Sequence, residues 1–148
     1  MKRFVMAFTL AGALALSGCA SVPKGDDDLD AALKTFTAPG DVAGLYVYRY
    51  ERASAITKMD VEVDGKSIGK TIARTYVYTV LEPGRHRIVS KAKNEDALEL
   101  EAQPGRLYYV WQEVKPGVFS TRTKLHLVHE LDGQTGVRKT RLTVPEMK

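Results

Sequence analysis

Short stretches of alternating apolar and polar residues, separated by glycine-containing turns, fill the chain from about residue 41 onward. Residues 59–64 alternate apolar and acidic side chains, which places the two kinds on opposite faces of a strand. Asp64-Gly65 then suits a two-residue hairpin turn, and Pro83-Gly84 and Pro104-Gly105 suit type II turns. This pattern favours a mainly β fold.

We expect a single antiparallel β-sandwich, immunoglobulin-like or transthyretin-like, with seven or eight strands. Each Pro-Gly turn, at residues 83–84 and 104–105, is predicted to join its two neighbouring strands into a hairpin. Residues 107–111 are apolar on both faces, which predicts a central strand. Asp132-Gly133 is predicted to form the turn before the last strand.

One short helix is expected ahead of the strands, over residues 28–36. Aspartates at its start are favoured by the helix dipole, and they lack the alternating ligand spacing of a calcium loop. Leu29, Leu33 and Phe36 share one face of this helix, which should pack on the domain. Pro39-Gly40 ends it.

The first residues have the order of parts of a secretory signal. Met1-Lys2-Arg3 is basic, and residues 4–16 are apolar or small except for Thr9. That run is shorter than the roughly 20 apolar residues a spanning helix needs. Leu16-Ser17-Gly18-Cys19 resembles the lipobox of bacterial lipoproteins, which implies cleavage after Gly18 and lipid on the Cys19 sulfur and the new amino terminus. The alternative is an ordinary signal whose cysteine stays free or pairs between molecules.

These boundaries divide the chain into three parts. We expect a lipoprotein signal peptide at residues 1–18, a lipidated N-terminus with tether and helix at 19–40, and the β-sandwich domain at 41–148. Among Gram-negative lipoproteins an aspartate after the cysteine typically retains the protein in the inner membrane. Ala20 stands there instead, which implies a cell-envelope location on the periplasmic face of the outer membrane.

Charge and residue constellations exclude several function classes. Lys2 and Arg3 leave with the signal, so the net charge falls from +4 to +2, and we expect no nucleic-acid partner. A strand would place His126 and His129 on opposite faces, and we expect His86 to lean inward, so no metal site is predicted. No nucleophile elbow or phosphate loop occurs. We expect no enzyme activity, no catalytic residue and no cofactor beyond the lipid on Cys19.

Aromatic residues are the remaining candidates for a binding surface. Most should pack in the core or between sheets. The alternative is that one tyrosine row lies on an outer face and recognises a partner, because tyrosine and tryptophan are enriched at recognition sites. The candidate residues of this surface are Tyr46, Tyr48, Arg49, Tyr108, Tyr109, Trp111 and Glu113.

Four motifs in order carry a resemblance to a known family. They are Leu45-Tyr46-Val47-Tyr48-Arg49, Val63-Asp64-Gly65-Lys66-Ser67-Ile68-Gly69, Pro83-Gly84-Arg85-His86-Arg87-Ile88 and Tyr108-Tyr109-Val110-Trp111-Gln112-Glu113. From about Phe36 to Val137 the chain resembles small uncharacterised bacterial lipoproteins whose domain is catalogued as one of unknown function. Residues 61–89 are also similar to PEGA-type β-modules, which bears on fold only. Neither resemblance implies an activity.

The expected function is therefore a membrane-anchored envelope lipoprotein that carries a non-enzymatic β-sandwich for interaction or envelope support. Its partners would be the membrane, through the lipid, and an envelope protein or small ligand. The alternative is a lipoprotein that binds a lipid or a cell-wall fragment. A deep pocket with convergent polar groups would favour the alternative, and a flat aromatic patch would favour a protein partner.

Overall fold

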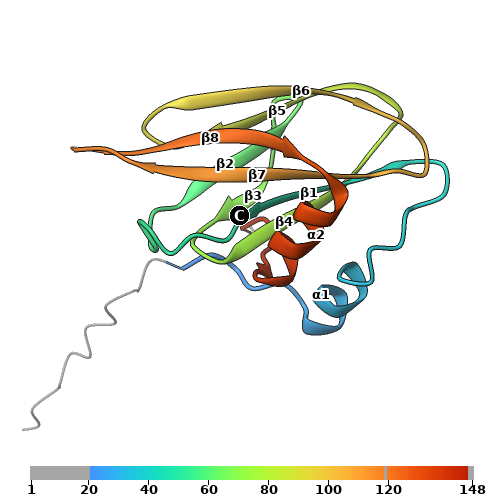
Figure 1. Cartoon of the computed structure of the whole chain (residues 1–148), viewed down its shortest axis with the longest axis horizontal. Helices are drawn as coiled ribbons and strands as arrows, with labels where there is room; N and C mark the ends of the chain where they lie inside the picture. The colour runs from blue at the N-terminus through green and yellow to red at the C-terminus, as the bar shows by residue number, and fades with distance from the viewer. Residues whose placement is uncertain (1–20, 119, 147–148) are drawn as a thin grey trace, which may run out of the picture.

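Nine strands and two helices form in the computed structural model, which describes residues 21–118 and 120–146 (Figure 1). In chain order they are α1 (Asp27–Leu33), β1 (Ala43–Arg49), β2 (Met59–Val63), β3 (Lys66–Thr71), β4 (Thr75–Leu81), β5 (Gly84–Lys91), β6 (Glu95–Ala102), β7 (Leu107–Pro116), β8 (Thr121–Val128), α2 (Glu130–Arg138) and β9 (Arg141–Leu142). Within the described residues, no helix is long and apolar enough to cross a membrane.

The strands form two packed sheets, so the prediction of a mainly β sandwich is confirmed. One sheet has the order β8-β7-β1-β4-β9, and the other has the order β3-β2-β5-β6. Most neighbouring strands are antiparallel, but β1 pairs with β7 in parallel, and so does β4 with β9. These two parallel pairs depart from the purely antiparallel sandwich that the turns predict.

Side chains of β1 point alternately to the two faces of the sheet and enter two different hydrophobic clusters. Leu45 and Val47 point toward the second sheet and belong to an aliphatic cluster between the sheets. Tyr46 and Tyr48 point the other way, into an aromatic cluster beneath the helices. Figure 1 shows α2 lying across this outer face of the five-stranded sheet, with α1 beside it. The molecule therefore has a third layer, made of helices, on one face.

Only one of the three predicted hairpins forms. Asp64 and Gly65 both have positive φ and join β2 to β3, as predicted. The prediction for residues 83–84 and 104–105 is wrong, because these turns lead from β4 to β5 and from β6 to β7, which lie in different sheets. A Pro-Gly turn fixes local dihedrals, whereas it does not select the strand that the next segment pairs with.

Helix α2 replaces the turn expected at residues 132–133. Its two glycines lie where it meets the sheet, and both are buried. A Cβ on Gly133 would come within 2.2 Å of the Tyr109 side chain, and one on Gly136 within 2.1 Å of the Tyr48 ring. Gly133, predicted as a turn residue, and Gly136 are therefore the residues that let the helix approach the tyrosines.

Helix α1 forms near its predicted position but ends three residues earlier. Asp26 caps it, accepting a hydrogen bond from the Leu29 amide. Leu33 and Phe36 pack against the aromatic cluster as expected, whereas Leu29 is 47% exposed. The chain leaves the helix through Phe36, whose φ is 53°, so helical spacing does not continue to that residue.

Residues just before α1 are attached to the last strand. The Gly25 amide donates to the Leu142 carbonyl at 2.9 Å, and the Val144 amide donates to the Pro23 carbonyl at 3.2 Å. Lys24 forms an antiparallel bridge with Thr143. The folded body therefore begins at Pro23, while Cys19 and the predicted signal peptide lie outside the described residues.

Candidate binding site

The residues predicted to form an aromatic surface fall on both faces of the five-stranded sheet. Tyr46, Tyr48 and Tyr109 are at most 2% exposed, because α1 and α2 cover them. Tyr108 faces the other sheet and packs on the aliphatic core. Trp111 remains half-buried on the helical side. The expected row of tyrosines on an open face is therefore corrected to a covered layer with one open edge.

Arg49 also lies away from that edge, fully buried on the inner face. Its guanidinium donates to the carbonyl oxygens of Thr57 at 2.6 Å, Ser54 at 2.5 Å and Ala53 at 3.0 Å. These bonds fold the loop between β1 and β2 around the arginine. Burial lowers the pKa of Arg49 from its ordinary value, against the opposing charge of Glu51. Arg49 is thus a structural residue of the loop.

At the open edge, a crevice of about 360 Å³ separates α2 from the aromatic face of β1 and β7. The lining residues are Tyr48, Tyr50, Trp111, Val128, Asp132, Thr135, Gly136 and Lys139. We call this the aromatic crevice. Two of its lining residues, Tyr48 and Trp111, belong to the predicted surface.

Stacked rings form the floor of the aromatic crevice. Ring centroids are 6.2 Å apart for Tyr48 and Tyr50, 5.7 Å for Tyr50 and Trp111, and 4.9 Å for Trp111 and His126. The register of the sheet causes this ladder, because Tyr48, Trp111 and His126 lie opposite one another on β1, β7 and β8. An aromatic floor of this kind is suited to binding.

Polar groups surround the ladder. The Trp111 indole N–H donates to Glu51 Oε1 at 2.7 Å, which fixes the orientation of the ring. Lys139 Nζ lies 5.5 Å from the centre of the Tyr50 ring. Asp132 lies near the start of α2 and Lys139 is its C-cap residue, about two helical turns later, so both line the crevice from the same side of the helix. Burial raises the pKa of Tyr48 to about 12, which keeps its hydroxyl protonated.

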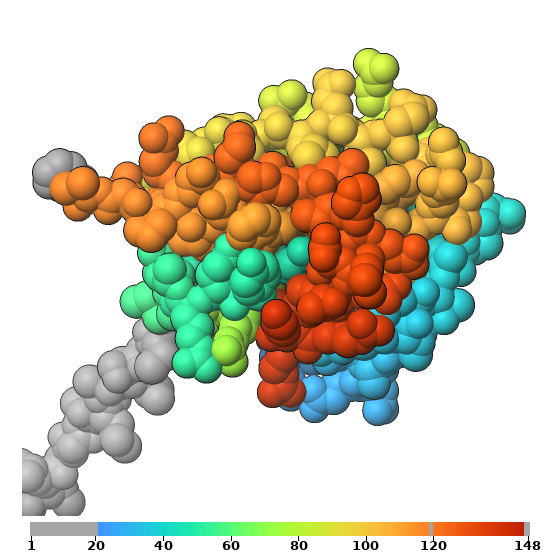
Figure 2. All heavy atoms as spheres, in the orientation of Figure 1, coloured from blue at the N-terminus to red at the C-terminus, as the bar shows by residue number. Residues whose placement is uncertain are grey.

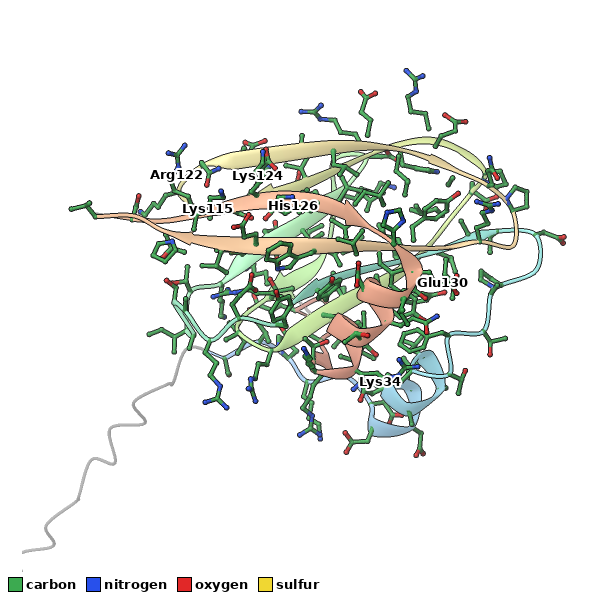
Figure 3. All side chains as sticks on the ribbon, in the orientation of Figure 1. Lys34, Lys115, Arg122, Lys124, His126 and Glu130 are labelled. Carbon is green, nitrogen blue, oxygen red and sulfur yellow. The ribbon has the colours of Figure 1, made fainter. Side chains whose placement is uncertain are left out.

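Glu113, the last predicted site residue, holds the outer end of the ladder. Its carboxylate lies 2.7 Å from His126 Nε2 and 3.7 Å from Lys115 Nζ. Figure 3 shows His126 on β8, with Lys115, Lys124 and Arg122 nearer the hairpin tip. Glu113 therefore positions the His126 ring against Trp111.

The histidines are dispersed. His86 lies in the other sheet, hydrogen-bonded to Asp64 and to the Glu82 carbonyl, so it has the partner expected of it. His129 is the residue before α2. No group of three metal-ligating side chains occurs in the portion of the chain that the structure describes.

A wider, open groove of about 700 Å³ lies on the opposite side of β8. Cationic Lys115, Arg122 and Lys124 line part of it. Its polar groups form hydrogen bonds with the backbone at the edge of β8. The Asn94 side chain accepts from the Thr123 amide and donates to the Thr123 carbonyl. Asp96 likewise accepts from the Leu125 amide. The groove is thus where two sheet edges meet and protect each other.

The predicted surface contains only two of the eight residues that line the crevice. Asp132, Thr135 and Gly136 belong to α2, and Lys139 is its C-cap residue. The sequence pattern presents residues 132–133 of this helix as a turn. The acidic residues at its start and Arg138 at its end were the available signal, since they complement a helix dipole. Tyr50 continues the alternation of Tyr46 and Tyr48 and was detectable in the same way.

Comparisons with known proteins support the family resemblance. Residues 39–124 match the family described as "Protein of unknown function (DUF2846)". An uncharacterized protein of Haemophilus influenzae (strain ATCC 51907 / DSM 11121 / KW20 / Rd) is 31% identical over 147 residues, covering 97% of this chain and 86% of that protein. No solved structure matches. The chain therefore belongs to the DUF2846 family, as the four motifs predict.

Proposed function

We propose that this protein is a lipid-anchored, non-catalytic binding module of the bacterial cell envelope, held on the periplasmic face of the outer membrane. The observation that carries the proposal is the attachment of Pro23 and Gly25 to the last strand. This attachment lies four residues after Cys19, the cysteine of the lipobox-like motif. The folded body would begin almost at the lipid.

Chain length sets the working distance of such a module. Four extended residues span at most about 14 Å, so the body would stay beside the membrane surface. Two or three acyl chains on Cys19 would make the attachment effectively permanent. A module held so close to a membrane suits contact with membrane-proximal partners. The aromatic crevice is the recognition site that we assign to it.

Replacement of Cys19 by serine tests the anchor. Cells that express the wild-type protein should incorporate labelled palmitate into it, and the protein should fractionate with membranes. The Cys19→Ser variant should take up no label and remain as uncleaved precursor. Ser17→Ala keeps the cysteine and should retain the label. Equal labelling of the Cys19→Ser and wild-type proteins would refute the anchor.

A second candidate function is binding of a small lipid or cell-wall fragment. The aromatic crevice favours it, because Asp132 and Lys139 converge on a volume that a small ligand could fill. Trp111 is the single tryptophan of the chain, so its fluorescence reports on the crevice alone. Solubilised peptidoglycan fragments or a short-chain phospholipid should shift its emission saturably. Emission that neither probe changes would exclude this candidate.

A further inference from the structure

The loops at one end of the sandwich carry an excess of positive charge. They are residues 50–58, 72–74 and 92–94, which connect strands, and residues 139–141, which lead from α2 into β9. All lie at the end where the β7–β8 hairpin projects (Figures 1 and 2). We call this the loop end. Its charged residues are the exposed cations Arg52, Lys58, Arg74, Lys93, Lys139 and Arg141, and one carboxylate, Glu51.

Contacts between the loops hold them together as one surface. The Ala73 amide donates to the Ala55 carbonyl at 3.1 Å, and the Ser54 and Thr121 hydroxyls are 2.8 Å apart. Lys58 pairs with Glu146 and Arg141 with Asp27. The other four cations have no salt-bridge partner within the described residues.

The opposite end has the reverse charge. It is made of residues 38–42, 64–65, 82–83 and 103–106. Its charged residues are three acids, Asp41, Asp64 and Glu82, and one base, Arg106. One end of the sandwich is therefore positive and the other negative, although the net charge of the whole chain is small.

The loop end also exposes apolar side chains and receives the N-terminal segment. Ile56 is 71% exposed, and Val118, in the β7–β8 turn beside the loop end, is 91% exposed. The segment attached to Pro23 continues to Glu146, whose carboxylate lies 2.9 Å from Lys58 Nζ. Figure 1 shows the described chain starting at this same end. The tether and the positive loops thus share one side of the molecule.

We infer that the loop end faces the membrane and binds anionic phospholipid headgroups. This inference rests on the proposed lipid anchor, which brings the loop end to the bilayer. Lysine and arginine are attracted to anionic lipid within about a Debye length, roughly 8–10 Å, and the tether keeps the loops near that range. Exposed Ile56 and Val118 can enter the headgroup region, while the acidic end and its turns point away.

Lipidated protein in vesicles tests the orientation. Because Cys19 is acylated and no other cysteine is present, Ile56→Cys and Glu82→Cys each offer one thiol for a dye. The two sites lie at opposite ends of strands roughly 20 Å long. In vesicles with about one-third phosphatidylglycerol, a headgroup nitroxide should quench the dye at position 56 at least about threefold more than at position 82. Neutral phosphatidylcholine vesicles should reduce this difference.

Charge reversal provides matched variants. Arg52→Glu with Arg74→Glu should abolish the preference, and Lys66→Glu with Arg106→Glu, which lie toward the other end, should leave it unchanged. Equal quenching at both sites, or a preference that ignores the anionic lipid, would overturn the inference. Flotation of the vesicles is measured first. Protein that floats but shows equal quenching contradicts only the orientation, whereas protein that does not float contradicts the anchor and the orientation together.

Discussion

Close contact between glycine and tyrosine decides how α2 meets the sheet. Gly136 lies against the Tyr48 ring, and Gly133 lies against Tyr109. Interiors packed to this density do not accept an added methyl group without displacement of their neighbours. Both glycines therefore let the helical layer pack on the sheet, and Gly136 also lines the aromatic crevice beside Tyr48.

Gly136→Ala should destabilise the protein although alanine favours a helix by about 1 kcal/mol. Overpacking against Tyr48 costs about 1–3 kcal/mol, so we expect a net loss of about 1 kcal/mol in the free energy of unfolding. Chemical denaturation measures it. Gly40→Ala is the control, since nothing lies within 4 Å of the added carbon. A more stable Gly136→Ala variant would show that α2 does not press on Tyr48.

His86 and Asp64 should make stability depend on pH. His86 Nδ1 lies 2.6 Å from the Asp64 carboxylate and Nε2 lies 2.6 Å from the Glu82 carbonyl, so both ring nitrogens face acceptors. The hydrogen bond with Asp64 raises the pKa of His86 above its ordinary 6.5. The contribution of the charged histidine is thus fully present below pH 6.5 and lost as pH rises through the raised pKa.

Asp64→Asn tests this pair while keeping the turn, because asparagine also accepts positive φ. The pKa of His86, followed by NMR, should fall toward 6.5. The free energy of unfolding should drop more below pH 6.5 than above the raised pKa of His86, where the ring has lost its proton. Asp64 itself stays ionised across this range, because the Arg87 amide and then His86 lower its pKa. An identical His86 titration in both proteins would contradict the account.

Individual residues differ in how far the sequence predicts them. Alternation within β1 places Tyr46 and Tyr48 on one face correctly, because a period of two is a property of any strand. Arg49 follows the same alternation inward, but its partners are carbonyl oxygens of a folded loop, which no side-chain pattern reveals. Its burial was therefore beyond prediction from the sequence.

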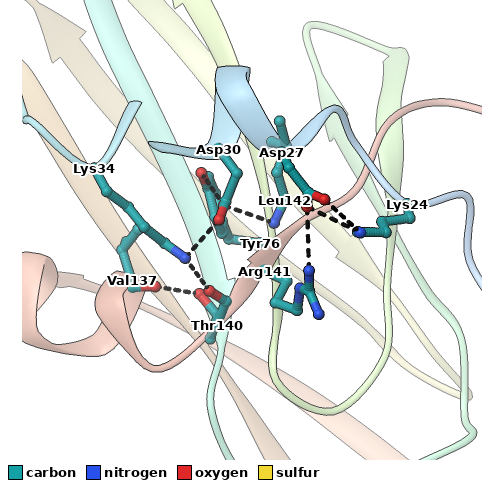
Figure 4. A network of polar contacts seen from close by, with 9 residues as sticks. All are labelled: Lys24, Asp27, Asp30, Lys34, Tyr76, Val137, Thr140, Arg141 and Leu142. Carbon is teal, nitrogen blue, oxygen red and sulfur yellow. Dashed lines mark hydrogen bonds and ion pairs between the residues drawn. The ribbon is translucent and has the colours of Figure 1, made fainter. Parts of the chain in front are cut away.

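At the scale of elements, a polar network docks α1 on the body (Figure 4). Asp30 accepts from the Tyr76 hydroxyl at 2.8 Å, the Leu142 amide at 3.0 Å and Lys34 at 2.8 Å. Burial alone would raise the pKa of Asp30, but these hydrogen bonds outweigh it and lower the pKa. One carboxylate thereby connects α1 to β4 and β9.

Asp30→Ala should release α1. The change leaves the buried Tyr76 hydroxyl and the Leu142 amide without their acceptor, at a cost on the order of 2 kcal/mol in the free energy of unfolding. Asp28→Ala removes an exposed carboxylate from the same helix and should cost well under about 1 kcal/mol. Denaturation of both variants makes the comparison. Equal stabilities would mean that Asp30 does not dock the helix.

Strand pairing is the level at which sequence reasoning failed most. Turn chemistry and alternation located the strands, and a central strand at residues 107–111 was predicted correctly. However, β4 and β5 are adjacent in sequence but lie in different sheets, since β4 pairs with β1, and β5 pairs with β2 and β6. Such pairing depends on packing between whole sheets, which a local pattern does not contain.

At the scale of the whole molecule, the tether, α1 and the loop end act together. The attachment at Pro23 limits the distance between Cys19 and the folded body. Because α1 is docked on the body, residues after Pro23 do not add to the length of the tether. In the proposed anchored protein, the difference in charge between the two ends selects which end faces the membrane. A free tether running to about Gly40 would instead span up to roughly 70 Å and remove any preferred orientation.

Amide hydrogen exchange in the lipidated protein on vesicles tests the short tether most directly. The two amides of the N-terminal attachment, those of Gly25 and Val144, donate to backbone carbonyls, and Leu33 lies in the docked helix. We predict that all three exchange as slowly as the amides of β4. Exchange within seconds at Gly25 and Leu33, with β4 still protected, would show that the body is free to leave the membrane surface.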